Sequence, residues 1–91
     1  MKHLVVFTMK GCPHCGEFKT MLEENNITFY EHDIDEHNEE YEMFVQITEN
    51  EFVPAFMVID EGEIASAKCF APDSNFQTLE EALEIVQKEI I

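Results

Sequence analysis

Two kinds of apolar pattern alternate along the chain. The run from residue 3 to 8 is almost continuously apolar, which is typical of a strand buried in a sheet. The next segment, 13–25, places Phe18, Met21 and Leu22 three and four positions apart, as expected for one face of a helix. Applied to the whole chain, the same patterns predict strands at 3–8, 27–34, 55–59 and 63–70 and helices at 13–25, 37–47 and 73–90.

Turn residues separate these segments and determine the expected topology. Gly62, within the turn 60–63, can supply the positive φ of a tight hairpin, and Asp73 or Ser74 is suited to cap the last helix. A strand–helix–strand unit with a right-handed crossover pairs its strands in parallel, whereas a hairpin pairs them antiparallel. The sequence therefore predicts an α/β fold with the order β-α-β-α-β-β-α, in which helices cover both faces of one mixed four-stranded sheet.

Composition limits the chain to one domain and narrows its partners. Ninety-one residues with 45% hydrophobic content can form a single core, so we expect one domain spanning 1–91. A net charge of −15 leaves no basic face for nucleic acid or for an anionic membrane surface. We interpret this charge as a solvated surface, and steering toward a basic partner is the alternative. Because no apolar run approaches a membrane span and the N-terminus has no signal-peptide pattern, we expect a cytoplasmic protein. We also expect it to be a monomer.

The tetrad Cys12-Pro13-His14-Cys15 lies between the first predicted strand and the first predicted helix. A cysteine at the start of a helix meets free backbone N–H groups and the positive end of the helix dipole, both of which favour its thiolate. Cys12 therefore suits attack on a disulfide, and Cys15, one turn later, suits the resolving role. Pro13 fits the first helical position because it has no N–H to leave unpaired, and a cationic His14 would further stabilise the thiolate.

These residues resemble the active site of the thioredoxin superfamily, and the length and opening strand are most similar to its glutaredoxin branch. The resemblance covers essentially the whole chain and also rests on Val53-Pro54 before the third predicted strand. It implies a thioredoxin-like fold of the glutaredoxin type. It further implies that Pro54 follows a cis peptide bond beside the active-site disulfide, and that the backbone of Val53 pairs with a bound peptide or glutathione.

The chain departs from the glutaredoxin pattern at several positions. His14 stands where glutaredoxins typically carry Tyr, and the same Cys-Pro-His-Cys tetrad is known from bacterial periplasmic disulfide-forming oxidases. Phe52 replaces the Thr of the Thr-Val-Pro signature, and Ala71-Pro72 replaces the Gly-Gly pair that cradles glutathione. Lys10 is offset by one position from the basic residue that meets a glutathione carboxylate. These departures leave the dithiol chemistry intact and leave two electron donors open, glutathione and a thioredoxin reductase.

The resemblance implies a dithiol–disulfide oxidoreductase that reduces protein disulfides through Cys12 and Cys15 and holds no bound cofactor. Such a protein could donate electrons to a reductive enzyme such as ribonucleotide reductase. The alternative is an iron–sulfur or zinc-binding module on the same scaffold. Pro13 argues against it, because cluster-binding relatives usually carry Gly or Ser there. The chain also has no second C-x-x-C and no H-x-x-H to complete a zinc site.

Other reactive side chains also need an interpretation. Cys69 lies in a strand pattern and is expected to be a small buried residue, with a regulatory thiol as the alternative. The stretch 32–37 contains the metal-ligand types His32, Asp33, Asp35 and His37. It lacks the Gly and the terminal Glu of a calcium-binding loop, so we expect a solvated strand-to-helix loop. Lys10 and Lys19 flank the cysteine pair in an otherwise acidic chain, where their charges would support a thiolate.

Overall fold

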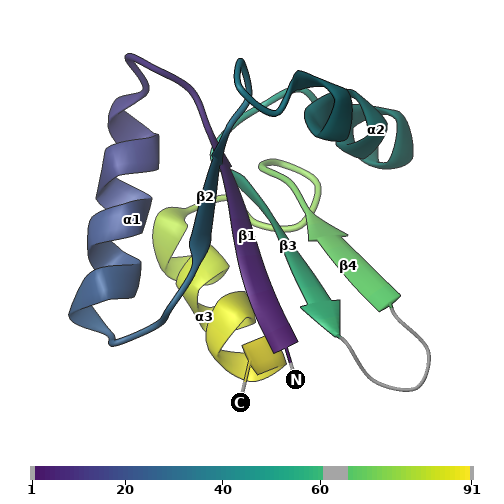
Figure 1. Cartoon of the computed structure of the whole chain (residues 1–91). Helices are drawn as coiled ribbons and strands as arrows, with labels where there is room; N and C mark the ends of the chain where they lie inside the picture. The colour runs from purple at the N-terminus through teal and green to yellow at the C-terminus, as the bar shows by residue number, and fades with distance from the viewer. Residues whose placement is uncertain (1, 61–65, 91) are drawn as a thin grey trace.

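A computed structural model describes residues 2–60 and 66–90 of the chain. Its elements follow the predicted order (Figure 1). They are β1 (Lys2–Thr8), α1 (Pro13–Glu24), β2 (Tyr30–Asp33), α2 (Asn38–Thr48), β3 (Ala55–Asp60), β4 (Ser66–Phe70) and α3 (Leu79–Ile90). The predicted α/β fold class and element order are therefore confirmed.

The four strands form one mixed sheet in the order β2-β1-β3-β4. β1 pairs in parallel with β2, so that Phe7 lies opposite His32, and antiparallel with β3, so that Val5 lies opposite Met57. β3 and β4 also pair antiparallel. A parallel pair needs a long crossover connection, which α1 provides. The predicted mixture of parallel and antiparallel pairing is confirmed.

Successive side chains of β1 point to opposite faces of the sheet, and each face has its own apolar cluster. Two helices, α1 and α3, cover one face of the sheet (Figure 1), and Leu4 and Val6 belong to the apolar cluster on that face. There they pack with Phe18 of α1, Phe56 of β3 and Val86 of α3, all of which are fully buried. This cluster fastens α1, and with it the cysteine motif, to the centre of the sheet.

The opposite face is covered by α2 (Figure 1). Val5 and Phe7 of β1 pack there against Tyr41 and Phe44, the two buried residues of α2. The ring centroids of Phe7 and Phe44 are 4.8 Å apart. Helices therefore cover both faces, as predicted, with two helices on one face and one on the other.

The last helix begins later than the sequence predicts. Asp73 has a left-handed φ of 66°, so the predicted helix start at 73 and its cap at Asp73 or Ser74 are wrong. The helix is instead capped by Thr78, whose Oγ1 accepts a hydrogen bond from the backbone N–H of Glu81 at 3.2 Å. In return, the Glu81 carboxylate accepts a hydrogen bond from the backbone N–H of Thr78. Phe76 is spaced as a helical core residue, but it reaches the core from the turn before the helix.

β2 is also shorter than the predicted strand at 27–34, because its parallel ladder with β1 begins only at Tyr30. Ile27 and Phe29 precede the ladder and pack, partly buried, against the core under α1 and α3. The predicted hairpin turn around Gly62 and the first residues of the last predicted strand lie outside the described residues. Within 2–60 and 66–90, no helix combines the length and apolar character needed to cross a bilayer.

Candidate active site

A tight turn joins β1 to α1 and carries the first cysteine. The backbone N–H of Cys12 donates to the carbonyl of Met9 at 3.3 Å, and Gly11 has a φ of 78°. Residues with a side chain rarely adopt this φ, so the glycine lets the chain turn directly into α1. Pro13 follows as the first helical residue, in the position predicted for it.

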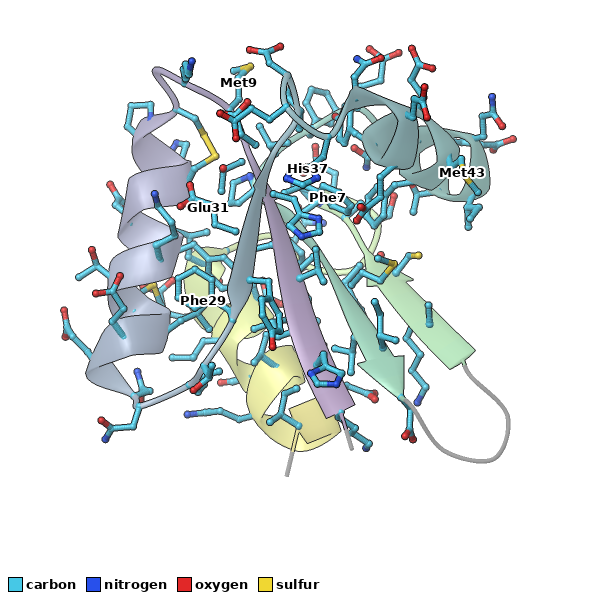
Figure 2. All side chains as sticks on the ribbon, in the orientation of Figure 1. Phe7, Met9, Phe29, Glu31, His37 and Met43 are labelled. Carbon is cyan, nitrogen blue, oxygen red and sulfur yellow. A yellow bond between two sulfur atoms is a disulfide. The ribbon has the colours of Figure 1, made fainter. Side chains whose placement is uncertain are left out.

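Cys12 and Cys15 form a disulfide at the N-terminal end of α1, seen as the yellow bond in Figure 2. Their Cα atoms are 5.3 Å apart. Cys12 is the N-cap residue, and its Sγ accepts a hydrogen bond from the backbone N–H of Cys15 at 3.2 Å. Cys12 is half-buried, whereas Cys15 is only 2% exposed. An incoming sulfur atom can therefore reach Cys12 more readily than Cys15, and the N–H group would stabilise a thiolate at Cys12.

A depression of about 500 Å³ opens beside both cysteines and is lined in part by Lys10, Lys19 and Glu31. Lys19 Nζ lies 2.8 Å from the Glu31 carboxylate, and the Thr8 hydroxyl donates to the same oxygen at 2.9 Å. The hydrogen bond from Lys19 lowers the pKa of Glu31 from its usual 4.5; burial opposes this shift and the Thr8 bond adds to it. Because Glu31 compensates its charge, Lys19 supports a thiolate less than the sequence suggests.

A second depression, of about 350 Å³, lies on another side of α1 and is lined in part by His14, Val53 and Pro54. The His14 side chain is 72% exposed, and its Nδ1 is 3.9 Å from the Glu17 carboxylate. The Val53–Pro54 peptide bond is cis, as the resemblance implies, and Pro54 is buried. The predicted substrate-contacting residues are thus divided, with Lys10 beside the cysteines and the other two beside His14.

The loop before Pro54 is held by a buried amide that the sequence analysis did not single out. Asn50 Oδ1 accepts a hydrogen bond from the N–H of Phe52 at 2.8 Å. Its Nδ2 donates to the carbonyl of Pro72 at 2.6 Å and to the Ser74 hydroxyl at 3.2 Å. Asn50 therefore joins two loops, both of which contribute walls to the second depression.

The remaining candidates lie on the face that α2 covers. Cys69 of β4 is half-buried opposite Met57, and burial raises the pKa of its thiol, in agreement with a packing role. His32 and His37 are half-buried and stacked, rather than solvated as expected, and they meet Glu40. These three residues are the ones that could hold a metal ion in the described part of the chain.

Three residues that shape the site were missed from the sequence. Gly11 carried a usable signal, because a glycine directly before the cysteine pair marks a turn. Glu31 and Asn50 carried none, since Lys19 is 12 residues from Glu31 and Pro72 is 22 residues from Asn50. Contacts of that kind depend on how the strands and loops come together.

Comparisons with known proteins place the chain in a family. Residues 4–62 match the sequence model of the family described as Glutaredoxin, and no curated protein matches the chain. Among solved structures, the chain is similar to the thioredoxin-like protein BC3987, with a TM-score of 0.56, 22% identity and coverage of 93% of this chain and 96% of that chain. Its T8A mutant gives a TM-score of 0.57, 20% identity and coverage of 97% and 99%. These two structures show the thioredoxin-like fold; because the sequence model spans more than half of the chain, the protein belongs to the glutaredoxin family of thiol oxidoreductases.

Proposed function

We propose that the protein reduces disulfides in other proteins through a dithiol–disulfide cycle of Cys12 and Cys15. The observation that carries the proposal is the disulfide at the start of α1. Cys12 is the more accessible of the two cysteines, and its Sγ accepts a hydrogen bond from the backbone N–H of Cys15, whose own side chain is buried. After reduction, the same N–H group and the helix dipole favour the thiolate at Cys12, which is the form that attacks.

The cycle has two exchange steps. The Cys12 thiolate attacks one sulfur of the substrate disulfide, a mixed disulfide forms, and the other substrate sulfur leaves as a thiolate that takes up a proton. Cys15 then loses its proton and attacks Cys12 Sγ, which restores the Cys12–Cys15 disulfide and releases the second substrate sulfur as a thiol. Each turn moves two electrons from the protein to its substrate; one of the two protons comes from Cys15 and the other from solvent.

The oxidised protein must then recover two electrons and two protons from a second thiol system. Two molecules of glutathione supply them when they are oxidised to glutathione disulfide, and a thioredoxin reductase is the other donor in the proposal. Lys10 and Val53 line different depressions, so a glutathione that contacts both would have to span the two. The proposed substrates include a reductive enzyme such as ribonucleotide reductase. We propose that the protein acts on them as a monomer in the cytoplasm.

Pro13 and His14 have tuning roles in the proposal. Pro13 sets the entry of the chain into α1, which positions Cys12 as the N-cap. A cationic His14 stabilises the thiolate of the reduced form but not the neutral disulfide, and this difference raises the reduction potential. The Glu17 carboxylate, 3.9 Å from His14, acts in the opposite direction.

No contact among the described residues favours the alternative, an iron–sulfur or zinc module at these cysteines. Both sulfurs are bonded to each other rather than directed at a shared metal position. Colour of the purified, reduced protein, or bound metal that is lost in the Cys12→Ser variant, would reveal such a module directly.

The test is an insulin-reduction assay that starts from the oxidised form of this protein. NADPH supplies the electrons, either through glutathione and its reductase or through a thioredoxin reductase. We expect turnover with one of the two donors and none after Cys12→Ser. Cys69→Ser is the matched control and should keep the full rate, because Cys69 lies half-buried on the other face. Absence of turnover with both donors, or turnover that survives Cys12→Ser, would contradict the proposal.

A further inference from the structure

Two histidines and a glutamate meet where β2 ends and α2 begins. His32 Nδ1 lies 2.9 Å from Glu40 Oε1. The rings of His32 and His37 stack with centroids 4.0 Å apart and planes inclined by 8°. One ligand atom from each of the three residues lies within 4.8 Å of the others. The chain thus gathers two imidazoles and one carboxylate at a single position.

The fold holds these three side chains in place from several directions. The rings of Phe7 and His32 meet nearly at right angles, with centroids 6.2 Å apart and planes at 75°. The N–H of His37 donates to the carbonyl of Asp33 at 2.9 Å, which closes the turn between β2 and α2. His37 is the N-cap of α2, and Glu40 lies one turn further on. The cluster is therefore set by the sheet on one side and by the helix start on the other.

We propose that His32, His37 and Glu40 bind a zinc ion that ties the end of β2 to the first turn of α2. Imidazole nitrogen and carboxylate oxygen are ligands that suit zinc, and three protein ligands with one water complete its tetrahedral coordination. The net charge of −15 raises the local concentration of cations around the chain. Magnesium and calcium require mainly oxygen ligands, so the two imidazoles select against them.

Zinc binding requires a small contraction of the cluster. Ligand atoms around tetrahedral zinc lie about 3.3 Å apart when the bonds are about 2.0–2.1 Å long. The ligand atoms lie within 4.8 Å of one another, so the widest separation must close by at most about 1.5 Å. Parallel imidazoles direct their lone pairs along parallel lines, so the stacked rings must also turn about their Cβ–Cγ bonds. All three side chains are half-buried, so each keeps a solvent-exposed side toward which it can rotate.

The zinc would add a connection where α2 has few others. Tyr41 and Phe44 are the buried residues of α2, and both lie beyond its first turn. His32 faces α2, whereas its neighbours Glu31 and Asp33 line the depression beside the cysteines. The metal therefore lies on the reverse side of β2 from the proposed redox site and is independent of it. Because the ligands come together only in the folded chain, zinc should raise the temperature of unfolding.

The test uses the full chain with the Cys12–Cys15 disulfide intact and Cys69→Ser, so that no thiol competes for zinc. Calorimetric titration with zinc chloride should show one site per chain. His32→Gln, His37→Gln and Glu40→Gln should each weaken binding at least about tenfold, the loss seen when even outer partners of a metal ligand are removed. The matched controls His3→Gln and Glu39→Gln should bind as the parent does, and magnesium should not compete.

A second measurement needs no ligand substitution. In the same protein, zinc should shift the imidazole nitrogen resonances of His32 and His37 and leave those of His3 and His14 in place. Equal zinc affinity in the parent and in the His32→Gln/His37→Gln double variant would overturn the proposal. Shifts centred on His3 or His14 would also overturn it. The cluster would then be only a hydrogen-bonded contact between His32 and Glu40 with His37 stacked beside it.

Discussion

The two faces of the sheet are built differently. Under α1 and α3, nine buried residues of the described chain form one apolar cluster, whereas six do so under α2. The larger cluster anchors α1, whose first turn carries the disulfide. The smaller one lies beside the histidine pair and Cys69. The chemistry is thus carried by the helix with the stronger apolar anchor, which keeps Cys12 in position while a substrate approaches.

Two neighbouring residues of β2 show the same difference in detail. Glu31 connects the strand to α1 through Lys19, and His32 connects it to α2 through Glu40. The Lys19–Glu31 ion pair lies on the face with the larger apolar cluster, while the His32–Glu40 contact lies on the face with the smaller one. We therefore expect apolar truncations to matter most on the α1 and α3 face, and polar truncations to matter most around α2.

The largest effect should come from Phe56→Ala, compared with Phe44→Ala on the other face. Both rings are almost fully buried, but Phe56 stacks against Phe18, Phe70 and Phe76, with centroids 5.0–5.6 Å away. Loss of a buried phenylalanine ring costs about 3–5 kcal/mol of unfolding free energy. Denaturant titrations should place Phe56→Ala at the upper end of that range and Phe44→Ala below it. An equal or larger loss for Phe44→Ala would remove the proposed difference between the faces.

Asn50→Ala should produce the next largest loss. The amide is 9% exposed and joins the chain after α2 to the loop before α3 through three hydrogen bonds. Its removal deletes these partly buried hydrogen bonds, each worth about 0.5–1.5 kcal/mol of unfolding free energy. Chemical denaturation measures this loss, and Asn38→Ala, at an exposed position of α2, is the control. If Asn50→Ala and Asn38→Ala were equally stable, the hydrogen bonds of Asn50 would not contribute to the free energy of unfolding as expected.

How much was predictable from the sequence depended on the range of each interaction. The order of elements and the position of Cys12 at a helix start follow from local periodicity and from Pro13, and both were predicted. The start of α3 was missed although the Thr78-x-x-Glu81 capping box was visible, because Phe76 continued the apolar spacing. The meeting of His32 with Glu40 was not predictable locally, since it depends on the turn between β2 and α2 and on the packing of Phe7.

His14→Tyr tests the tuning of the disulfide at the end of α1. Loss of a cationic imidazole should lower the reduction potential by an amount on the order of 30 mV, equivalent to about 1.4 kcal/mol. Histidine carries its charge only at mildly acidic pH, so the difference should shrink as the pH rises toward 8. Equilibration with a redox buffer at several pH values measures it. Glu17→Gln should shift the potential the opposite way, and identical potentials in all three proteins would make His14 a bystander.

Glu31→Gln should have the smallest effect, and one that depends on pH. The folded-state pKa of Glu31 is lowered from 4.5, mainly by its hydrogen bond from Lys19, so the charged form stabilises the fold. That stabilisation is complete well above pH 4.5 and is lost as the pH falls through the lower folded value. Parent and variant should therefore differ slightly at pH 7 and converge at pH 3 in thermal unfolding. A difference that grows toward acid would contradict this sign, and Glu23→Gln at an exposed position of α1 is the control.

The most direct measurement of the central claim is to trap the mixed disulfide. Reduced Cys15→Ser protein, carrying Cys69→Ser to remove the third thiol, should attack insulin and stop as a covalent adduct. Mass spectrometry after proteolysis should locate the adduct at Cys12, because the buried thiol that releases the substrate is missing. The matched protein with Cys12→Ser and Cys69→Ser, in which Cys15 is intact, should form no adduct. An adduct at Cys15 in that protein, or none at Cys12 in the first, would contradict the assignment of Cys12 as the attacking residue.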